Sequence, residues 1–391
     1  SQDRFEASAR ELGLNPFPVP SANMSRAYVN PLGMQLAPCT YCGFCEKHGC
    51  GNYSKSSPQT TIIPVLMKRE NFTLRTDSEV LSVEKSPDGT RTTGVTYVDT
   101  SGEEFFQPAE VVVLCAYPLE NARLMLLSDI GTSYDPQTGE GVVGKNYCYQ
   151  VMSGATVFYD EEYTNGFVGA GALGMAVDEY NGDNFDHSGL GFIGGGYIAC
   201  YTTNARPIES HPVPDGVPGW GSEWKQSVRA NFLKTTTVGV HGASMAHRSN
   251  YLDLDPTYTD RHGRPLLRMT YDFTLNDRRL TAHITPVAEE IARGMGGREV
   301  NVAERKGSYD SMPYQTTHNT GGTIMGTDPK TSVCNRYCQS WDLHNLFVAG
   351  AGLFPQNAGY NPTGTVAALA YWSVAAIIEQ YMADPGPLVQ A

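Results

Sequence analysis

Four cysteines fall close together near the start of the chain. Cys39, Cys42, Cys45 and Cys50 are separated by two, two and four residues, with glycines among them. Thiolates at such short intervals suit iron–sulfur ligation, because glycines let the backbone fold around a cluster and donate N–H bonds to its sulfurs. Structural zinc and a pair of disulfides stay open as alternatives. The spacing fits either three or four irons.

A histidine and an asparagine near the other end of the chain form a second candidate site. His318 opens the segment HNTGGTIMG, and Asn361 follows the segment NLFVAGAGLFPQ. Histidine commonly takes a proton from an alcohol, and a strand that ends in glycines and leads into a helix suits a phosphate-bearing cofactor. We predict that His318 and Asn361 face a bound ring system and that the nearby glycines allow close approach of a ligand. A packing or surface role for His318 remains the alternative.

Two further patterns carry less weight. Residues 169–174 read GAGALG, which matches the G-x-G-x-x-G fingerprint. No helical pattern follows them, and no acidic residue stands at the required distance, so we predict that they bind no dinucleotide. His48 lies inside the cysteine loop and is a less favoured metal ligand than the thiols.

Composition excludes several classes of partner. The 391 residues are 40% hydrophobic and 18% charged, with a formal net charge of −13. Such an acidic chain argues against direct binding to nucleic acid or to an anionic membrane surface. No apolar run approaches the roughly 18 to 20 residues that span a bilayer, and no signal peptide opens the chain. The start at Ser1 suggests a processed chain whose targeting segment is gone.

The hydrophobic pattern predicts the elements that position these residues. Residues 72–98 read as strands with a hairpin turn at Asp88 and Gly89, and residues 111–115 read as a strand buried on both faces. A helix follows over about 120–128. Residues 147–274 predict a mostly antiparallel sheet with few helical signals. An amphipathic helix over about 276–296 and an apolar helix over about 365–382 complete the pattern.

Several segments resemble a known family. HNTGGTIMG, NLFVAGAGLFPQ and NPTGTVAALA resemble the C-terminal signatures of the glucose–methanol–choline (GMC) oxidoreductases. VVVLCAYPLENARLMLLS is similar to the strand and helix with which that family contacts its flavin. The cysteine loop resembles the membrane-associated dehydrogenase branch, which passes electrons to a multihaem cytochrome.

The resemblance implies FAD as the cofactor and transfer of a hydride from a carbinol carbon to the flavin. His318 would be the base, and Asn361 would orient the hydroxyl group. The implied flavin contacts are Val80, Cys115, Ala116, Gly350, Ala351, Asn361, Pro362, Thr363 and Thr365. A three-iron (3Fe-4S) cluster is implied in preference to a four-iron one, with Cys42, Cys45 and Cys50 as ligands and Cys39 as the spare thiol.

The implied fold class is α/β (α+β), with an FAD-binding Rossmann-like domain and a mostly antiparallel β-sheet substrate domain with helices. Residues 1–146 would hold the iron–sulfur loop and part of the FAD-binding domain. Residues 147–310 would bind substrate, and residues 311–391 would return to the FAD-binding domain with the catalytic residues. The family's N-terminal G-x-G-x-x-G segment is missing here, so we expect a complete FAD site to need residues from outside this chain, in a preceding segment or a separate chain.

The resemblance also implies a function. We expect a dehydrogenase subunit that oxidises a sugar acid or polyol, with D-gluconate as the best single guess. Its electrons would reach a cytochrome c subunit of a complex that also holds a small subunit, in the periplasm and peripheral to the inner membrane. Two rivals remain: an oxygen-using sugar oxidase with structural cysteines, and a flavin-less electron-transfer or scaffold subunit.

Overall fold

The computed structural model describes residues 2–42, 45, 48–160, 164, 173–201, 211–311 and 317–389. The chain divides into two compact units, each built from three separate segments. Unit 1 comprises residues 1–74, 152–242 and 278–306, and unit 2 comprises residues 75–151, 243–277 and 307–391. The predicted division into cofactor-binding and substrate-binding segments stays a prediction.

Unit 1 is organised around one six-stranded sheet. Its strand order is β1 (Phe17–Pro18), β10 (Met175–Val177), β11 (Gly196–Tyr201), β12 (Thr235–Gly242), β9 (Val151–Phe158) and β15 (Glu299–Ala303). The pairs β1–β10, β10–β11, β11–β12 and β9–β15 are antiparallel. The prediction of a mostly antiparallel sheet in this part of the chain is therefore confirmed.

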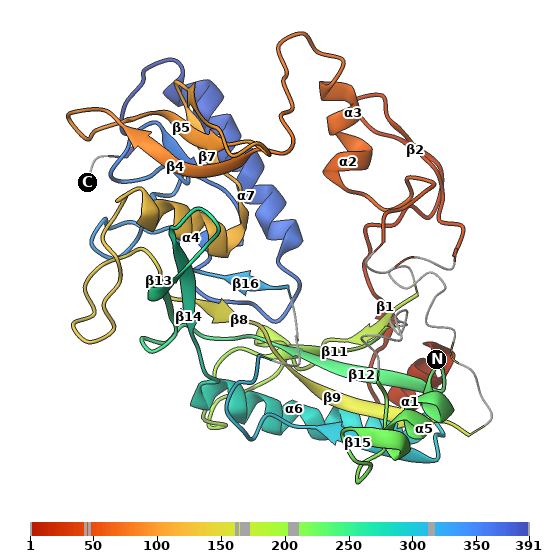
Figure 1. The fold of residues 1–391 in the computed structure, drawn as a ribbon. Coiled ribbons are helices and arrows are strands. Elements are labelled where there is room, and N and C mark those ends of the chain that lie inside the picture. The colour runs from red at the N-terminus through yellow and green to blue at the C-terminus, as the bar shows by residue number, and fades with distance from the viewer. Residues whose placement is uncertain are drawn as a thin grey trace. The chain divides into compact units, whose positions relative to one another are not determined.

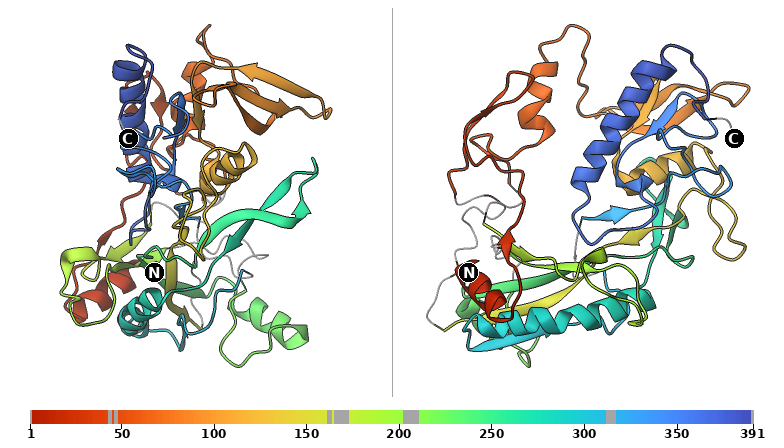
Figure 2. Two further views of the ribbon diagram at one scale, coloured as in Figure 1. Left: turned by 90° about the vertical axis from the view of Figure 1, so that its left-hand side faces the viewer. Right: turned by 180° about the vertical axis from the view of Figure 1, so that it is seen from behind.

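A long amphipathic helix supports this sheet. Helix α6 (Leu275–Gly294) runs along it in both views (Figures 1 and 2), where the sequence predicts a helix over about 276–296. Its inward side chains Leu280, Ile284 and Ile291 are fully buried. Helix α1 (Gln2–Glu11) joins it through the Ser8 hydroxyl, which donates to the Ile291 carbonyl over 2.8 Å.

The remaining elements of unit 1 are short. They are the ribbon of β2 (Tyr28–Val29) and β3 (Gln35–Leu36), the helical turns α2 (Pro58–Thr61) and α3 (Ile63–Leu66), the 3-10 turn η2 (Gly182–Asn184) and helix α5 (Gly221–Asn231). The hydrophobic pattern of the sequence does not predict α5. Its only buried residue is Asn231, so it has no apolar face whose period could have revealed it.

Unit 2 contains a three-stranded antiparallel sheet and a parallel strand pair. The sheet is formed by β4 (Glu79–Lys85), β5 (Thr92–Val98) and β6 (Glu104–Pro108), and the hairpin predicted at Asp88 and Gly89 joins the first two. Strand β7 (Val112–Leu114) pairs in parallel with β17 (Leu346–Val348). Burial of β7 on both faces was wrong, because Val113 is 42% exposed while its neighbours Val112 and Leu114 are buried. Side chains of this chain cover only one face of the strand.

Helices and short ribbons complete unit 2. They are α4 (Tyr117–Leu127), the hairpin β13 (Tyr251–Thr259) and β14 (Pro265–Thr270), the pair β8 (Cys148–Tyr149) and β16 (Asn319–Thr320), the turn η3 (Ala351–Leu353), and α7 (Thr363–Ala376) with its π-helical end η4 (Ile377–Tyr381). Within the described ranges, no helix combines the length and apolarity that a membrane span requires.

Candidate functional site

The parallel pair in unit 2 brings two predicted contact segments to one sheet edge. Leu114 pairs with Val348, and the Ala349 amide donates to the Leu114 carbonyl over 2.8 Å. Because parallel strands end at the same edge, Cys115 and Ala116 lie beside Gly350 and Ala351. The carboxyl edge of parallel strands is where open α/β sheets bind their ligands.

Asn121 connects the ends of β7 and β17 by hydrogen bonds. Its Oδ1 accepts a hydrogen bond from the Ala116 amide over 2.8 Å, and its Nδ2 donates to the Ala349 carbonyl over 3.0 Å. Asn121 itself is fully buried. The buried Asn121 side chain therefore fixes the backbone that follows both strands, and this backbone forms a rigid surface at the sheet edge.

Gly350 leaves space at this edge. Its φ of +108° lies in the region that favours glycine, and within the described part of the chain no atom beyond its sequence neighbours stands within 4 Å of the position a Cβ would take. Asn121 holds this backbone on its buried side, and the side at Gly350 is unobstructed. Such a backbone fits an extended cofactor such as a flavin nucleotide. The open position at Gly350 is compatible with an FAD contact there, whereas Ala351 is buried, and the roles of both residues stay predictions.

His318 lies half-buried just before β16. Its Nδ1 is 2.6 Å from Oε1 of Gln150, and its carbonyl accepts from Nδ2 of Asn357 over 2.6 Å. Strand β16 pairs with β8, which ends one residue before Gln150. Burial lowers the pKa of His318, so the ring is neutral near pH 7 and can accept a proton.

A chain of hydrogen bonds fixes the residues that flank His318. The Tyr147 hydroxyl donates to Oδ1 of Asn319, and Nδ2 of Asn319 donates to the Tyr117 hydroxyl over 2.5 Å. The Tyr117 hydroxyl donates in turn to the Thr317 carbonyl over 2.7 Å. Tyr117 starts α4 with a φ of +75°, a conformation that a non-glycine residue holds only when its surroundings enforce it.

Gly321 and Gly322, which follow His318, have a structural role that differs from the predicted one. A Cβ on Gly321 would lie 1.9 Å from the Asn146 carbonyl oxygen, and one on Gly322 would lie 2.9 Å from the Leu252 side chain. Both glycines have positive φ. They let two segments of the protein pack closely, so the interpretation that they make room for a ligand was wrong.

The remaining predicted flavin contacts are exposed or half-buried in this chain. Asn361 is exposed, and Pro362 leads into α7, whose first-turn residues Thr363 and Thr365 are exposed too. Val80 is exposed on β4. The first amides of a helix lack partners within the helix, so the start of α7 offers N–H donors to a ligand. The roles assigned to these residues stay predictions.

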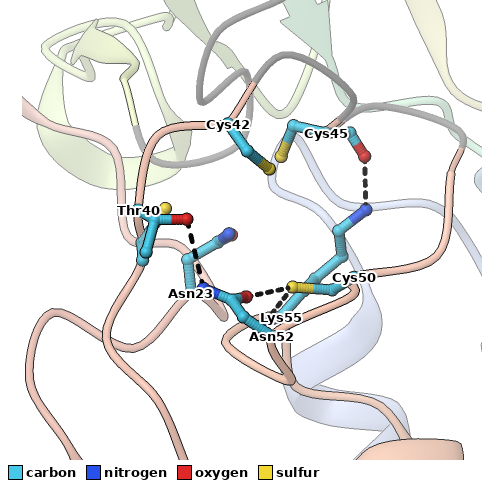
Figure 3. Close-up of a pocket in the computed structure, with 8 residues that line it drawn as sticks. Asn23, Thr40, Cys42, Cys45, Cys50, Asn52 and Lys55 are labelled. Atoms are coloured by element: carbon cyan, nitrogen blue, oxygen red, sulfur yellow. Dashed lines mark hydrogen bonds between the residues drawn. The ribbon is translucent and has the colours of Figure 1, made fainter.

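The cysteine loop of unit 1 gathers its four thiols around one pocket. Cys39, Cys42, Cys45 and Cys50 line it together with Asn23, Thr40, Asn52 and Lys55, as Figure 3 shows. All nine cysteines of the chain carry free thiols. The four thiols thus share one pocket, as the spacing predicts, and no disulfide joins them in the structure. Their role as metal ligands stays a prediction.

Lys55 and Asn52 close this loop. Nζ of Lys55 donates to the carbonyls of Cys45, over 2.6 Å, and His48, over 2.9 Å. Asn52 donates to Oγ1 of Thr40 over 3.3 Å, while its Oδ1 lies 2.9 Å from the Cys50 sulfur (Figure 3). These contacts tie the beginning of the loop to its end.

Backbone amides point at two of the sulfurs. The Lys55 amide donates to the Cys50 sulfur over 3.3 Å, and the Tyr41 amide donates to the Cys39 sulfur over 3.4 Å. Burial works to raise the pKa of the Cys50 thiol, but hydrogen bonds from the backbone of Lys55, Asn52 and Ser54 outweigh it and lower that pKa. Such donors favour the thiolate, which is the form that binds metal.

Among the residues that the structure describes, no group of three His, Cys, Asp or Glu side chains can hold one ion. The choice between zinc and an iron–sulfur cluster at this pocket stays a prediction.

The 169–174 fingerprint lies mainly outside the described residues, which resume at Leu173. His48, the less favoured metal ligand, is exposed. The sequence does not predict the residues that position the others, which are Gln150, Asn121, Asn319, Lys55 and Asn52. Single amide side chains and one lysine produce no periodic pattern in the sequence. Their roles become apparent only from the residues that they contact in the fold.

Comparison with known proteins places the chain in a family. The two parts of the GMC oxidoreductase profile match residues 21–152 and residues 246–370, which together make up more than half of the chain. The chain therefore belongs to the GMC oxidoreductase family, as the resemblance implied. The predicted fold class, mixed α/β with mostly antiparallel sheets, is confirmed as well.

Individual relatives agree with this assignment. The chain is 47% identical to the gluconate 2-dehydrogenase flavoprotein of Pantoea cypripedii over 395 aligned positions, which cover 100% of this chain and 64% of that protein. It is 30% identical to the fructose dehydrogenase large subunit of Gluconobacter japonicus, over 40% of this chain and 28% of that protein. The chain thus spans less than two thirds of the length of the Pantoea relative.

A solved structure shares the fold. Pyridoxine 4-oxidase from Mesorbium loti superposes with a TM-score of 0.55 at 17% identity, over 83% of this chain and 61% of that one. At this identity the match supports the fold and carries no information about substrate.

Proposed function

We propose that the whole protein is an FAD-dependent dehydrogenase that oxidises a secondary hydroxyl group of a sugar acid or polyol, with conversion of D-gluconate to 2-dehydro-D-gluconate as the specific reaction. The neutral imidazole of His318, held in the same unit as the open backbone edge at Gly350, is the observation that carries the proposal. The 47% identity to a gluconate 2-dehydrogenase flavoprotein supports the choice of substrate.

The bound flavin would supply a two-electron acceptor for the hydrogen that leaves the carbinol carbon as hydride. Gly350, Ala351, Cys115 and Ala116 would hold it at the strand edge, and the amides at the start of α7 would bind its polar atoms. Val80 would lie on the adenine side. Residues from outside this chain would complete the nucleotide site.

His318 would take the hydroxyl proton of the substrate. A positioned base of this kind contributes about 10² to 10⁴ to the rate, and it must be unprotonated at the working pH to accept the proton. Asn361 would orient the same hydroxyl by hydrogen bonding. Gln150 links the two segments, because its amide contacts His318 on one side and the Gly359 carbonyl, two residues before Asn361, on the other.

The cysteine pocket would hold an iron–sulfur cluster that carries electrons away from the flavin. Cys42, Cys45 and Cys50 would bind a three-iron cluster, with Cys39 as the spare thiol. The shared pocket, the N–H bonds to sulfur and the lowered pKa of Cys50 support this assignment. A cytochrome c subunit in the periplasm would accept the electrons, and it would anchor the complex, which includes a small subunit, at the inner membrane.

Anaerobic mixing with sugars and sugar acids tests the proposal. The oxidised flavin absorbance of the whole protein should bleach with D-gluconate and remain with compounds that lack the reactive hydroxyl. Electron paramagnetic resonance of the same samples should show an iron–sulfur signal. Bleaching without any such signal would favour a sugar oxidase with structural cysteines. A protein with no flavin absorbance would instead favour a scaffold subunit.

A further inference from the structure

Gln150 occupies an unusual position behind the His318 ring. It directly follows β8 and has no exposed surface. Its Nε2 donates to the carbonyl oxygens of Gly359, over 2.8 Å, and Ala358, over 3.3 Å. Its Oε1 lies 2.6 Å from Nδ1 of His318. Every polar atom of this side chain therefore has a defined neighbour.

These neighbours decide which way the amide faces. Backbone carbonyl oxygens only accept hydrogen bonds, so the two carbonyls of the 358–359 segment must face the NH₂ end of Gln150. A flipped amide would set its oxygen against two acceptors and lose both bonds. The amide oxygen must then face the histidine, and because this oxygen also only accepts, Nδ1 of His318 must carry a proton.

We propose that Gln150 is a positioning residue that locks His318 in the tautomer protonated on Nδ1, with the lone pair on Nε2. This inference rests on the proposed function, in which His318 is the base. In the reaction the substrate O–H bond breaks, its proton goes to Nε2, and the two electrons of the C–H bond leave with the hydride to the flavin. The Nδ1 proton stays in its bond to Gln150, whose oxygen then stabilises the imidazolium charge.

The backbone of His318 is held in the same direction. The His318 carbonyl accepts from Nδ2 of Asn357 over 2.6 Å and from the Gln150 amide over 3.4 Å. Because the main chain and Nδ1 are both held, the ring has little freedom to rotate and exchange its two nitrogens. The lowered pKa of His318 fits this picture, because the ring is neutral and its tautomer matters.

A buried glutamine could instead be only structural, and the chain offers a control for that case. Gln339 is also buried in unit 2, with 1% of its surface exposed. Its Nε2 likewise donates to two backbone carbonyls, those of His344 over 2.6 Å and Gly386 over 2.9 Å. Its Oε1 accepts from Asn335 and from the Leu388 amide rather than from a histidine.

The tautomer can be measured without turnover. Nitrogen-15 NMR of histidine-labelled whole protein, with the His318 signal assigned by its loss in His318→Asn, should show a protonated Nδ1 and an unprotonated Nε2. In Gln150→Leu the signal should move toward a mixture of tautomers. Wild-type protein with the proton on Nε2 would overturn the inference, even if Gln150→Leu fails to fold.

Kinetics of three variants complete the test. Gln150→Leu should lower kcat by about 10- to 100-fold with little change in KM, because the lone pair is misplaced in part of the population. Gln150→Glu keeps an acceptor and should recover part of kcat, with the acid limb of kcat/KM moved to higher pH because a carboxylate favours the imidazolium. Gln339→Leu should leave kcat within about 2-fold of wild type. Equal losses in Gln150→Leu and Gln339→Leu would contradict a role specific to His318.

The base role of His318 and the positioning role of Gln150 can be disproved separately. If the NMR signals show the expected tautomer and His318→Asn still turns over at the wild-type rate, the proposed function of His318 is wrong and the positioning by Gln150 stands. If His318→Asn is inactive, and Gln150→Leu keeps the wild-type tautomer of His318 and the wild-type kcat, then His318 remains the proposed base and the positioning role of Gln150 is wrong.

Discussion

The His318 site and the cysteine loop are held in different ways. His318 sits beside a paired strand, a fully buried glutamine and a hydrogen-bonded chain through Asn319 and two tyrosines. The cysteine loop is tied mainly by Lys55 and Asn52, and Cys42 is exposed. We infer that unit 2 builds its site before any ligand binds, while the cysteine loop would gain its final order from the proposed cluster. Metal ligation commonly supplies folding energy in this way.

The largest effect is expected at His318. His318→Asn removes the base and leaves the surrounding hydrogen bonds largely in place, so kcat should fall by about 10² to 10⁴. Flavin content and the melting temperature should stay close to those of wild type. Steady-state kinetics with D-gluconate and an artificial electron acceptor measure the change. Turnover at the wild-type rate would show that the preformed site of unit 2 is not where the chemistry occurs.

Cys45→Ser tests the cysteine loop, which is the second site of the comparison. Without one of its thiols the loop should lose most of its iron and the associated electron paramagnetic resonance signal, while the rest of unit 1 keeps its fold. Cys200→Ser is the matched control, because Cys200 is buried in the sheet of the same unit and burial raises its pKa to about 12, which disfavours the thiolate. Equal iron contents in the two variants would exclude the cysteine loop as the cluster site.

The rigidity of unit 2 can be tested at a largely buried ion pair. Arg123 on α4 bonds Asp260 at the tip of the β13–β14 hairpin over 2.5 Å, with only 10% and 13% of the two side chains exposed. Asp260→Asn leaves the arginine without its charge partner and should cost about 3 kcal/mol of unfolding free energy. The exposed pair of Arg91 and Glu110 is the control, and Glu110→Gln should cost less than about 1 kcal/mol.

The same pair predicts a pH dependence of stability. Burial acts to raise the pKa of Asp260, but hydrogen bonds from the Arg264 backbone and the Arg123 guanidinium hold that pKa at about 2. This value lies below that of an unfolded aspartate, about 3.9. The stabilisation is therefore present above pH 4 and is lost as the pH falls towards 2. Urea unfolding across this range should show the loss in wild type and a much weaker one in Asp260→Asn.

A smaller effect is expected at Lys55. Lys55→Gln shortens the donor that closes the cysteine loop, so iron should be lost to a chelator at about 10-fold lower concentration than in wild type. Lys68→Gln removes the same charge from an exposed position near α3 and should behave as wild type. If Lys55→Gln and wild type lose iron at the same chelator concentration, the cysteine loop does not depend on the hydrogen bonds of Lys55.

The sequence anticipates the parts of this protein that carry a local pattern. The spacing of the four cysteines predicts a shared pocket, the Asp88-Gly89 turn predicts a hairpin, and the apolar period of residues 276–296 predicts α6. In each case one short window contains the physical cause.

What the sequence does not anticipate depends on distant partners. Gln150 matters because of residue 318, and the glycine pair at 321–322 because of a carbonyl at 146 and a side chain at 252. Val113 reads as buried by hydrophobicity, yet its cover depends on which elements reach that face. Such tertiary neighbours leave no period in the chain.

The rate of anaerobic flavin reduction tests the central comparison most directly. D-gluconate would be mixed in a stopped-flow instrument with whole wild-type protein, His318→Asn and Cys45→Ser. We expect flavin reduction in Cys45→Ser to stay within about 2-fold of the wild-type rate, and flavin reduction in His318→Asn to be slower by about 10² or more. A rate in Cys45→Ser as low as that in His318→Asn, or a wild-type rate in His318→Asn, would contradict this expectation.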